Sequence, residues 1–172
     1  MVVGGKMTEL LLFTDGSVET KAHIGYGAYL VLADPGLPLD VARTQVKVRR
    51  FAPTSSTRLE LQTLLWALTA IGALPPRLTV FTDSQNIVGL PARRARLVAA
   101  DYYSAKGKRL NNYELYQEFY RLIDQVECTF VKVRGHQPAA HKERRDRFFT
   151  LVDRASRQAL RAEKERGMRC SS

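Results

Sequence analysis

Two short apolar runs in this chain end in nearly the same residues. One is Leu12-Phe13-Thr14-Asp15-Gly16-Ser17, and the other is Val80-Phe81-Thr82-Asp83-Ser84. Short runs that are apolar throughout are typical of strands buried on both faces of a sheet, here with an acid at the carboxyl end of each strand. Since helices must cover both faces of such a sheet, the chain is predicted to have an α/β fold.

The spacing of apolar residues predicts the other elements. Apolar or alternating runs predict five strands, at residues 9–15, 25–33, 41–51, 78–83 and 128–133. Helical patterns and end signals predict helices at residues 55–71, 84–89, 112–125 and about 142–165, and Pro91 is expected to stop the second of them. Short links between the first three strands predict an antiparallel meander. The predicted fold is a five-stranded mixed sheet flanked by helices.

The composition predicts one folded domain. The chain has 172 residues, of which 45% are apolar and 26% are charged, and this is enough apolar material for one core. We expect that core over about residues 9–161, followed by a polar basic tail at 162–172. The longest apolar stretch has about 12 residues, too few for the roughly 20 that cross a bilayer. With no secretory signal pattern and only two cysteines, we expect a cytoplasmic protein without membrane contact.

The charge of the chain is strongly basic and unevenly distributed. Its 27 Lys and Arg against 17 Asp and Glu give a net charge of +10. Between residues 90 and 110 there are six basic side chains and one acid, and Tyr102 and Tyr103 lie among them; the basic residues are Arg93, Arg94, Arg96, Lys106, Lys108 and Arg109. Basic residues interleaved with aromatic ones suit a nucleic-acid partner, although a solvated basic loop is the alternative.

The acids at the strand ends suggest a metal site. Ligands bind at the carboxyl ends of adjacent strands in α/β sheets, so Asp15 and Asp83 are expected to face one site. Two carboxylates about 4 Å apart repel by about 4 kcal/mol at an effective dielectric of 20, and a divalent cation removes that repulsion. Oxygen ligands select Mg²⁺ or Mn²⁺ over zinc. Glu60 lies between two leucines and needs a partner, unless it is simply exposed on its helix. Each Asp on its own is also compatible with a turn.

The three acids and one histidine belong to four short motifs that follow one another along the chain. They are Thr14-Asp15-Gly16-Ser17, Thr57-Arg58-Leu59-Glu60-Leu61, Thr82-Asp83-Ser84 and Val133-Arg134-Gly135-His136. In motif, order and spacing the set resembles the type 1 ribonuclease H family over roughly residues 10–161. The resemblance implies a ribonuclease H-like fold and hydrolysis of the RNA strand of RNA/DNA hybrids. It also implies two Mg²⁺ ions, with Mn²⁺ as an alternative, and products with 5′-phosphate and 3′-hydroxyl ends.

The resemblance assigns roles to residues of this chain. Asp15, Glu60 and Asp83 match three of the family's four metal-holding carboxylates. His136 matches a loop histidine that assists proton transfer and product release, the alternative being a surface histidine. For the fourth carboxylate, a count without gaps from His136 reaches Asp146. We choose Asp153 instead as the catalytic and metal-holding acid, because small apolar residues near it pack on a sheet.

The same resemblance assigns the substrate contacts. Gly16, Ser17 and Ser84 flank the matched acids, and Lys106, Lys108 and Arg109 lie in a segment that looks like the family's basic protrusion, which grips the DNA strand. Ser55, Ser56 and Thr57 stand where the family usually has Thr-Asn-Asn, whose side chains contact the hybrid's minor groove. Hydroxyls have a shorter reach, so double-stranded RNA or branched DNA remain alternative substrates. A non-cleaving nucleic-acid-binding module is the third hypothesis. We expect a monomer without an obligate protein partner.

Overall fold

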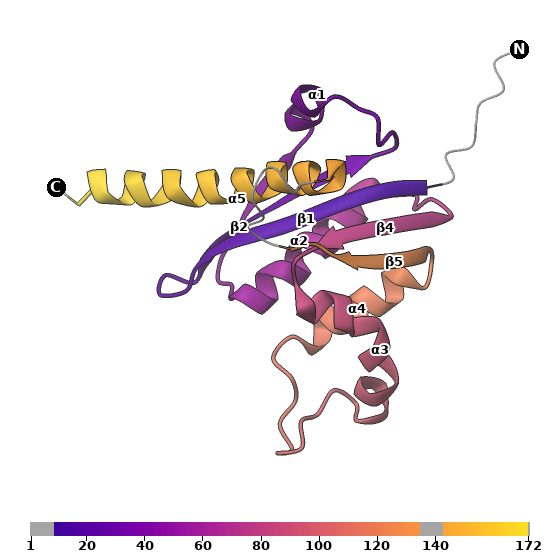
Figure 1. Cartoon of the computed structure of the whole chain (residues 1–172). Coiled ribbons are helices and arrows are strands. Elements are labelled where there is room, and N and C mark those ends of the chain that lie inside the picture. Colours follow the sequence, from indigo (N-terminus) through magenta and orange to yellow (C-terminus); the bar gives the residue numbers. More distant parts are fainter. Residues whose placement is uncertain (1–8, 135–142, 172) are drawn as a thin grey trace, which may run out of the picture.

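The structure, a computed structural model, describes residues 9–134 and 143–171. Five strands form one mixed sheet in the order β3-β2-β1-β4-β5, and helices cover both of its faces (Figure 1). The strands are β1 (Glu9–Glu19), β2 (Ile24–Leu32), β3 (Lys47–Phe51), β4 (Arg77–Thr82) and β5 (Glu127–Lys132). The helices are α1 (Leu39–Thr44), α2 (Ser56–Ile71), α3 (Gln85–Ala99), α4 (Tyr113–Ile123) and α5 (Arg144–Arg169). The predicted α/β class, with a five-stranded mixed sheet and three antiparallel strands first, is confirmed.

The sheet is open at one place, where β1 and β4 stop pairing. β1 pairs with β2 along nearly its whole length, from Leu11 opposite Leu32 to Glu19 opposite Ile24. Its parallel pairing with β4 covers only Glu9–Phe13. Beyond Phe13 the two strands are no longer paired, so a gap between them begins just before Asp15.

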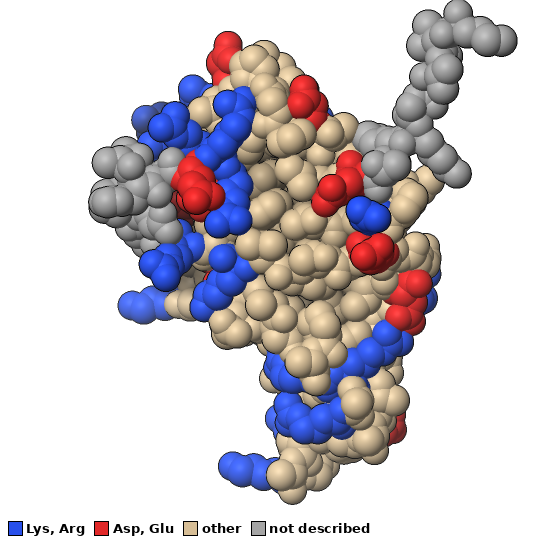
Figure 2. Space-filling model, turned by 45° about the vertical axis from the view of Figure 1, so that its right-hand side comes forward, with Lys and Arg blue, Asp and Glu red and all other residues tan. Residues whose placement is uncertain are grey.

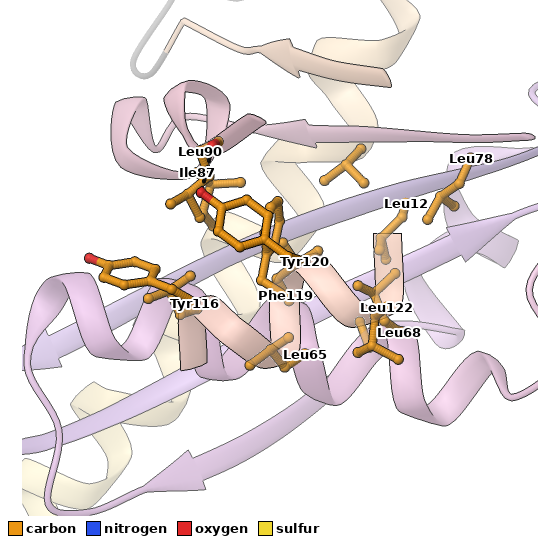
Figure 3. Packing of buried hydrophobic residues seen from close by; sticks show 14 of the residues in the cluster. Leu12, Leu65, Leu68, Leu78, Ile87, Leu90, Tyr116, Phe119, Tyr120 and Leu122 are labelled. Carbon is orange, nitrogen blue, oxygen red and sulfur yellow. Dashed lines mark hydrogen bonds between the residues drawn. The ribbon is translucent and has the colours of Figure 1, made fainter. Parts of the chain in front are cut away.

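Two apolar cores fill the space between the sheet and the helices. Side chains alternate along β1, so Leu12 joins the core under α2, α3 and α4 while Phe13 joins the core under α1 and α5. In the first core, α4 supplies Phe119, Tyr120 and Leu122 (Figure 3). In the second, the ring of Phe13 stacks on Phe81 and lies 5.6 Å from the ring of Phe148 in α5. Both faces of β1 are therefore buried, as its apolar run predicts.

The predicted end of the first strand is wrong. β1 does not turn at Asp15-Gly16 but continues to Glu19, because β2 supplies backbone partners as far as Ile24. The predicted strand at residues 41–51 is also only partly correct. Its first half belongs to α1, whose Ala42 is fully buried, and β3 begins at Lys47. Tertiary packing of this short helix thus overrides the local alternating pattern.

Pro91 does not stop the helix that precedes it. α3 runs through Pro91 to Ala99, and packing of Leu90 and Leu97 in the core accounts for the extension. Side chains also bind carbonyl groups near the proline. The Tyr120 hydroxyl donates to the Leu90 carbonyl at 2.7 Å, a contact drawn in Figure 3, and Arg93 donates to the Asn86 carbonyl at 2.7 Å. The hydrogen bond that Pro91 removes is the one to the Ile87 carbonyl, so these contacts stabilise the helix beside the proline and do not replace that bond.

The remaining helices lie close to their predicted positions. α2 and α4 match the predicted helices at 55–71 and 112–125 to within two residues at each end. α5 extends to Arg169, beyond the predicted end near residue 165. Within the two described ranges, no helix is long and apolar enough to cross a membrane.

Candidate active site

Three of the predicted acids meet where β1 and β4 separate. Asp15 lies in β1 just beyond the paired segment, and Asp83 directly follows the last residue of β4. Glu60 reaches the same place from α2, on the other face of the sheet from α5. A small pocket here is lined by Thr14, Asp15, Glu60, Thr63, Thr82, Asp83 and Ile87. The motifs that are distant in sequence therefore form one site.

The surroundings of the Asp15 carboxyl group disfavour its ionised form. Burial, the charge of Asp83, and a hydrogen bond and charge from Asp153 raise the pKa of Asp15 to about 8, against a smaller lowering effect of the Gly16 backbone N–H. Burial and like charges both favour the protonated carboxyl, and a nearby cation acts in the opposite direction. Asp15 is thus suited to a positively charged ligand.

Glu60 is oriented by Ser84. The Ser84 hydroxyl donates to Oε2 of Glu60 at 2.5 Å and accepts from the backbone N–H of Ile87 at 3.2 Å, which makes Ser84 the N-cap of α3. Burial raises the pKa of Glu60, the hydrogen bond from Ser84 lowers it, and the charge of Asp83 raises it. Ser84 is itself buried. Its hydroxyl therefore orients a carboxylate, a role that the predicted substrate contact does not include.

The two candidates for the fourth acid lie in different surroundings on α5. Asp153 reaches Asp15 and also pairs with Arg157, whose Nε lies 2.8 Å from Oδ1 of Asp153. Asp146 lies in the first turn, where its Oδ2 accepts from the backbone N–H of Glu143 at 2.9 Å in a capping box. The structure thus brings Asp153, and not Asp146, to the other acids. Asp146 has a local role at the helix start.

The donor set fits a hard divalent cation. All four acids offer only oxygen ligands, which is the chemistry that Mg²⁺ and Mn²⁺ prefer. Among the described residues, no three His, Cys, Asp or Glu side chains already stand close enough to hold one ion. Glu60 is turned toward Ser84 in this arrangement. Binding of a cation would thus require side-chain rotations, driven by the attraction between the carboxylates and the cation. His136 lies outside the described residues.

The other residues predicted near the acids have structural contacts. Gly16 lies so close to α2 that a Cβ atom there would be 2.8 Å from Cδ2 of Leu59. The hydroxyl of Ser17 lies 3.0 Å from the hydroxyl of Ser156 in α5. The absence of a side chain at Gly16 therefore lets α2, which carries Glu60, lie close to β1, and Ser17 contacts α5, which carries Asp153.

A polar groove lies beside the start of α2, where substrate contacts were predicted. Ser55 is the N-cap of α2 and accepts from the backbone N–H of Arg58 at 3.3 Å, while Ser56 is exposed and Thr57 is half-buried. The groove, of about 430 Å³, is lined by Ala52, Pro53, Thr54, Ser55, Arg58, Gln62, Asn111 and Asn112. The Arg58 guanidinium donates to Oδ1 of Asn112 at 3.4 Å. Arg58 belongs to one of the four motifs and Asn112 begins the predicted helix at residues 112–125, but neither was predicted as a substrate contact.

The predicted basic protrusion comprises the end of α3 and the loop between α3 and α4. Lys106 and Lys108 are exposed there. The Arg109 guanidinium lies over the ring of Tyr113, 4.0 Å from its centroid, and pairs with Asp101 at 3.6 Å. In Figure 2, Lys and Arg side chains gather over the lower part of the molecule, where α3 and this loop lie. The two lysines are therefore available to a polyanion, whereas Arg109 shapes the loop.

Comparison with known proteins agrees with this arrangement. A family model described as RNase H matches residues 7–158. The ribonuclease H of Cupriavidus pinatubonensis is 29% identical over 146 residues, covering 81% of this chain and 92% of that protein. The ribonuclease H of Ralstonia nicotianae is 27% identical over 157 residues, covering 91% and 99%.

A solved structure shares the fold. It is the crystal structure of a type 1 RNase H with the type 2 active-site motif, which matches with a TM-score of 0.60 at 23% identity and covers 88% of this chain and 72% of that one. The family match spans most of the sequence, and the sheet order and helix arrangement agree with the structural match. The chain therefore belongs to the ribonuclease H family of enzymes.

Proposed function

We propose that this chain cleaves the RNA strand of RNA/DNA hybrids with two divalent cations, Mg²⁺ or Mn²⁺. The residues proposed to hold the cations are Asp15, Glu60, Asp83 and Asp153. The observation that carries the proposal is the crowding of Asp15 by two other carboxylates at the gap between β1 and β4. Burial of like charges is costly unless a cation joins them, so the arrangement supports a metal-dependent site over a pure binding surface.

Different residues of the chain would have different roles in such a site. When bound, the two ions supply an activated water for attack on the phosphodiester and stabilise the leaving 3′-oxygen, so that 5′-phosphate and 3′-hydroxyl ends result. Ser84 holds Glu60 in place, and α5 holds Asp153 against Asp15. His136, which follows the strand next to β4, is proposed to assist proton transfer.

The surroundings of the acids support a nucleic-acid substrate. Hydroxyls at the start of α2 suit hydrogen bonds to a 2′-hydroxyl or a phosphate, and the Arg58 groove lies beside them. Lys106 and Lys108 are suited to contacts with phosphates of the DNA strand. The short hydroxyl side chains of Ser56 and Thr57 reach less far toward a minor groove and so select less strictly for a hybrid, which makes double-stranded RNA the second candidate substrate.

A cleavage assay with three substrates tests the proposal. The protein is incubated with labelled RNA/DNA hybrid, RNA duplex and DNA duplex, each in Mg²⁺, Mn²⁺ or chelator. We expect cleavage of the RNA strand of the hybrid with either cation and none in chelator. Asp15→Asn and Asp83→Asn should each abolish cleavage while hybrid binding is kept or tightened, because a metal ligand and a negative charge are lost together. Cleavage in chelator or retained activity in either variant contradicts the two-metal proposal.

A further inference from the structure

Alternate residues of β1 contact residues that lie progressively further along α5. The ring of Phe13 lies beside Phe148, Asp15 reaches Asp153, the hydroxyl of Ser17 lies 3.0 Å from that of Ser156, and Glu19 pairs with Lys164. Six residues of a strand span about 20 Å and sixteen residues of a helix span about 24 Å, so the two elements run alongside each other in the same direction. The strand and the helix are thus joined by a ladder of four contacts, which Figure 1 shows as α5 lying along β1.

Three contacts of this ladder are attractive, and the fourth joins two acids. Apolar packing and an ion pair join the outer contacts, and a hydrogen bond joins Ser17 to Ser156. Asp15 and Asp153 are both acids: a hydrogen bond joins them while one carboxyl is protonated, and they repel each other once both are ionised. Along β1, Phe13 and Ser17 are each two residues from Asp15. Along α5, Ser156 lies three residues from Asp153 and Phe148 lies five away, so the serine pair is the nearer contact. It is therefore the contact best placed to oppose separation of the two acids.

The hydrogen bonds of Ser156 reach Asp153 directly. Ser156 is fully buried, and its hydroxyl donates to the backbone carbonyl of Asp153 at 3.0 Å. A hydroxyl has a single hydrogen, so Ser17 is the donor in the bond between the two serines. Two consecutive hydrogen bonds therefore lead from Ser17 in β1 through Ser156 to the backbone carbonyl of Asp153. The chain of hydrogen bonds begins two residues after Asp15 in the strand.

We infer that Ser17 and Ser156 are positioning residues that hold Asp153 against Asp15 before a cation binds. The inference rests on the proposed metal-dependent function. It revises the predicted substrate contact of Ser17, because the hydroxyl of Ser17 is directed to α5. Groups that orient metal ligands typically change metal affinity by about 10- to 100-fold. Loss of either hydroxyl should therefore weaken metal binding without removing a ligand.

The test measures metal affinity with and without substrate. The variants are Ser17→Ala, Ser156→Ala and the double variant, and the two readouts are the Mg²⁺-dependent rise in melting temperature without nucleic acid and the Mg²⁺ midpoint of hybrid cleavage. We expect each single variant to raise both midpoints by about 10-fold. The double variant should raise them no further, because both hydroxyls act through one hydrogen bond. Saturating Mg²⁺ should restore the cleavage rate of Ser156→Ala.

Two further variants control the experiment. Thr69→Ala removes a comparable hydroxyl bond, to the Leu65 carbonyl in α2, and should leave the Mg²⁺ midpoints unchanged. Ser156→Cys keeps the buried volume with a weaker donor and should shift the midpoints in the same direction as Ser156→Ala, even if the alanine variant folds poorly. Unchanged midpoints in the serine variants of a protein that cleaves with Mg²⁺ would overturn the inference and leave the proposed function standing. A wild-type protein without Mg²⁺-dependent cleavage or stabilisation would overturn both.

Discussion

At the scale of single residues, the neighbours of each acid determine which contacts its carboxyl group makes. Asp153 and Asp146 belong to the same helix and lie seven residues apart, yet one reaches Asp15 while the other is engaged by the backbone of Glu143. Their separation along the helix axis is about 10 Å, whereas metal ligation tolerates only a few tenths of an ångström. Only one of the two can therefore join Asp15, Glu60 and Asp83.

Paired substitutions on α5 test the assignment of the fourth acid. Asp153→Asn should lower hybrid cleavage at least about tenfold and raise the Mg²⁺ concentration that is needed, because it changes a group at the proposed metal site. Asp146→Asn should cost up to about 1 kcal/mol of stability through the weakened capping box and leave cleavage nearly unchanged. Initial cleavage rates and chemical denaturation of both variants provide the comparison. The reverse pattern of rates would assign the metal ligand to Asp146.

At the scale of elements, close packing of α2 on β2 fixes the position of Glu60. A Cβ atom at Gly27 of β2 would lie 2.0 Å from Oγ1 of Thr63, which is shorter than any contact that side chains accept. Thr63 is buried and lies one turn beyond Glu60 along α2. The absence of a side chain at Gly27 therefore lets the helix approach the sheet.

Gly27→Ala should destabilise the protein by about 1–3 kcal/mol, because overpacking forces the helix and the strand apart. The same shift moves Glu60, so we also expect slower hybrid cleavage under conditions in which the variant is fully folded. Gly167→Ala is the matched control, because nothing lies within 4 Å of a Cβ atom at this position of α5. Urea denaturation of the two variants gives the free energies of unfolding. Equal stability of Gly27→Ala and wild type would show that the contact relaxes without cost.

The loop between α3 and α4 should contribute to the salt dependence of hybrid binding. Each phosphate contact adds about −0.9 to the slope of log affinity against log salt, so replacing Lys106 and Lys108 together by Ala should flatten the slope by about 2. Arg77→Ala, at the far end of β4 from Asp83, should leave the slope unchanged. Fluorescence anisotropy with Asp15→Asn as background avoids cleavage during the titration. A wild-type slope in the double variant would mean that the hybrid binds away from this loop.

At the scale of the whole molecule, the buried acids make stability depend on pH. The folded protein raises the pKa of Asp15 from 3.8 to about 8, so between these values the folded chain holds more protons than the unfolded chain. Stability without metal is therefore highest at the acidic end of this window with respect to this group, and is lost as pH rises toward 8.

This dependence is measurable as a shift of melting temperature. In chelator, ionisation of Asp15 should lower the melting temperature of the wild type as the pH rises from 5 to 8. Asp15→Asn should not show this part of the decrease, because its side chain does not ionise. Added Mg²⁺ should reduce the loss for the wild type at pH 8, because a cation stabilises the ionised acids. Asp40→Asn, an exposed acid in α1, serves as the control with the wild-type profile. Identical pH profiles for wild type and Asp15→Asn would contradict the crowding of Asp15.

The sequence alone predicted the class of fold and most of its elements. Apolar runs and helical stripes are local patterns that report which sides of an element are buried, so the strands, α2 and α4 could be located from them. The order of the motifs also predicted that Asp15, Glu60 and Asp83 share one site, and the structure brings them to the same gap. Local patterns could not predict α1 or the passage of α3 through Pro91, because packing against distant residues stabilises both.

Only the tertiary structure decided how the site is held together. The sequence left Asp153 and Asp146 as alternatives. The structure distinguishes them, because only Asp153 contacts Asp15, which lies in a strand more than a hundred residues away. The roles of Ser17, Ser84 and Arg109 likewise depend on partners from other elements, namely Ser156, Glu60 and Tyr113. Periodicity describes one element at a time, whereas a hydrogen bond or a ring contact between elements depends on how they pack. The sequence therefore predicted which acids belong to one site, and the packing of α5 and α2 on the sheet set which side chains contact and orient them.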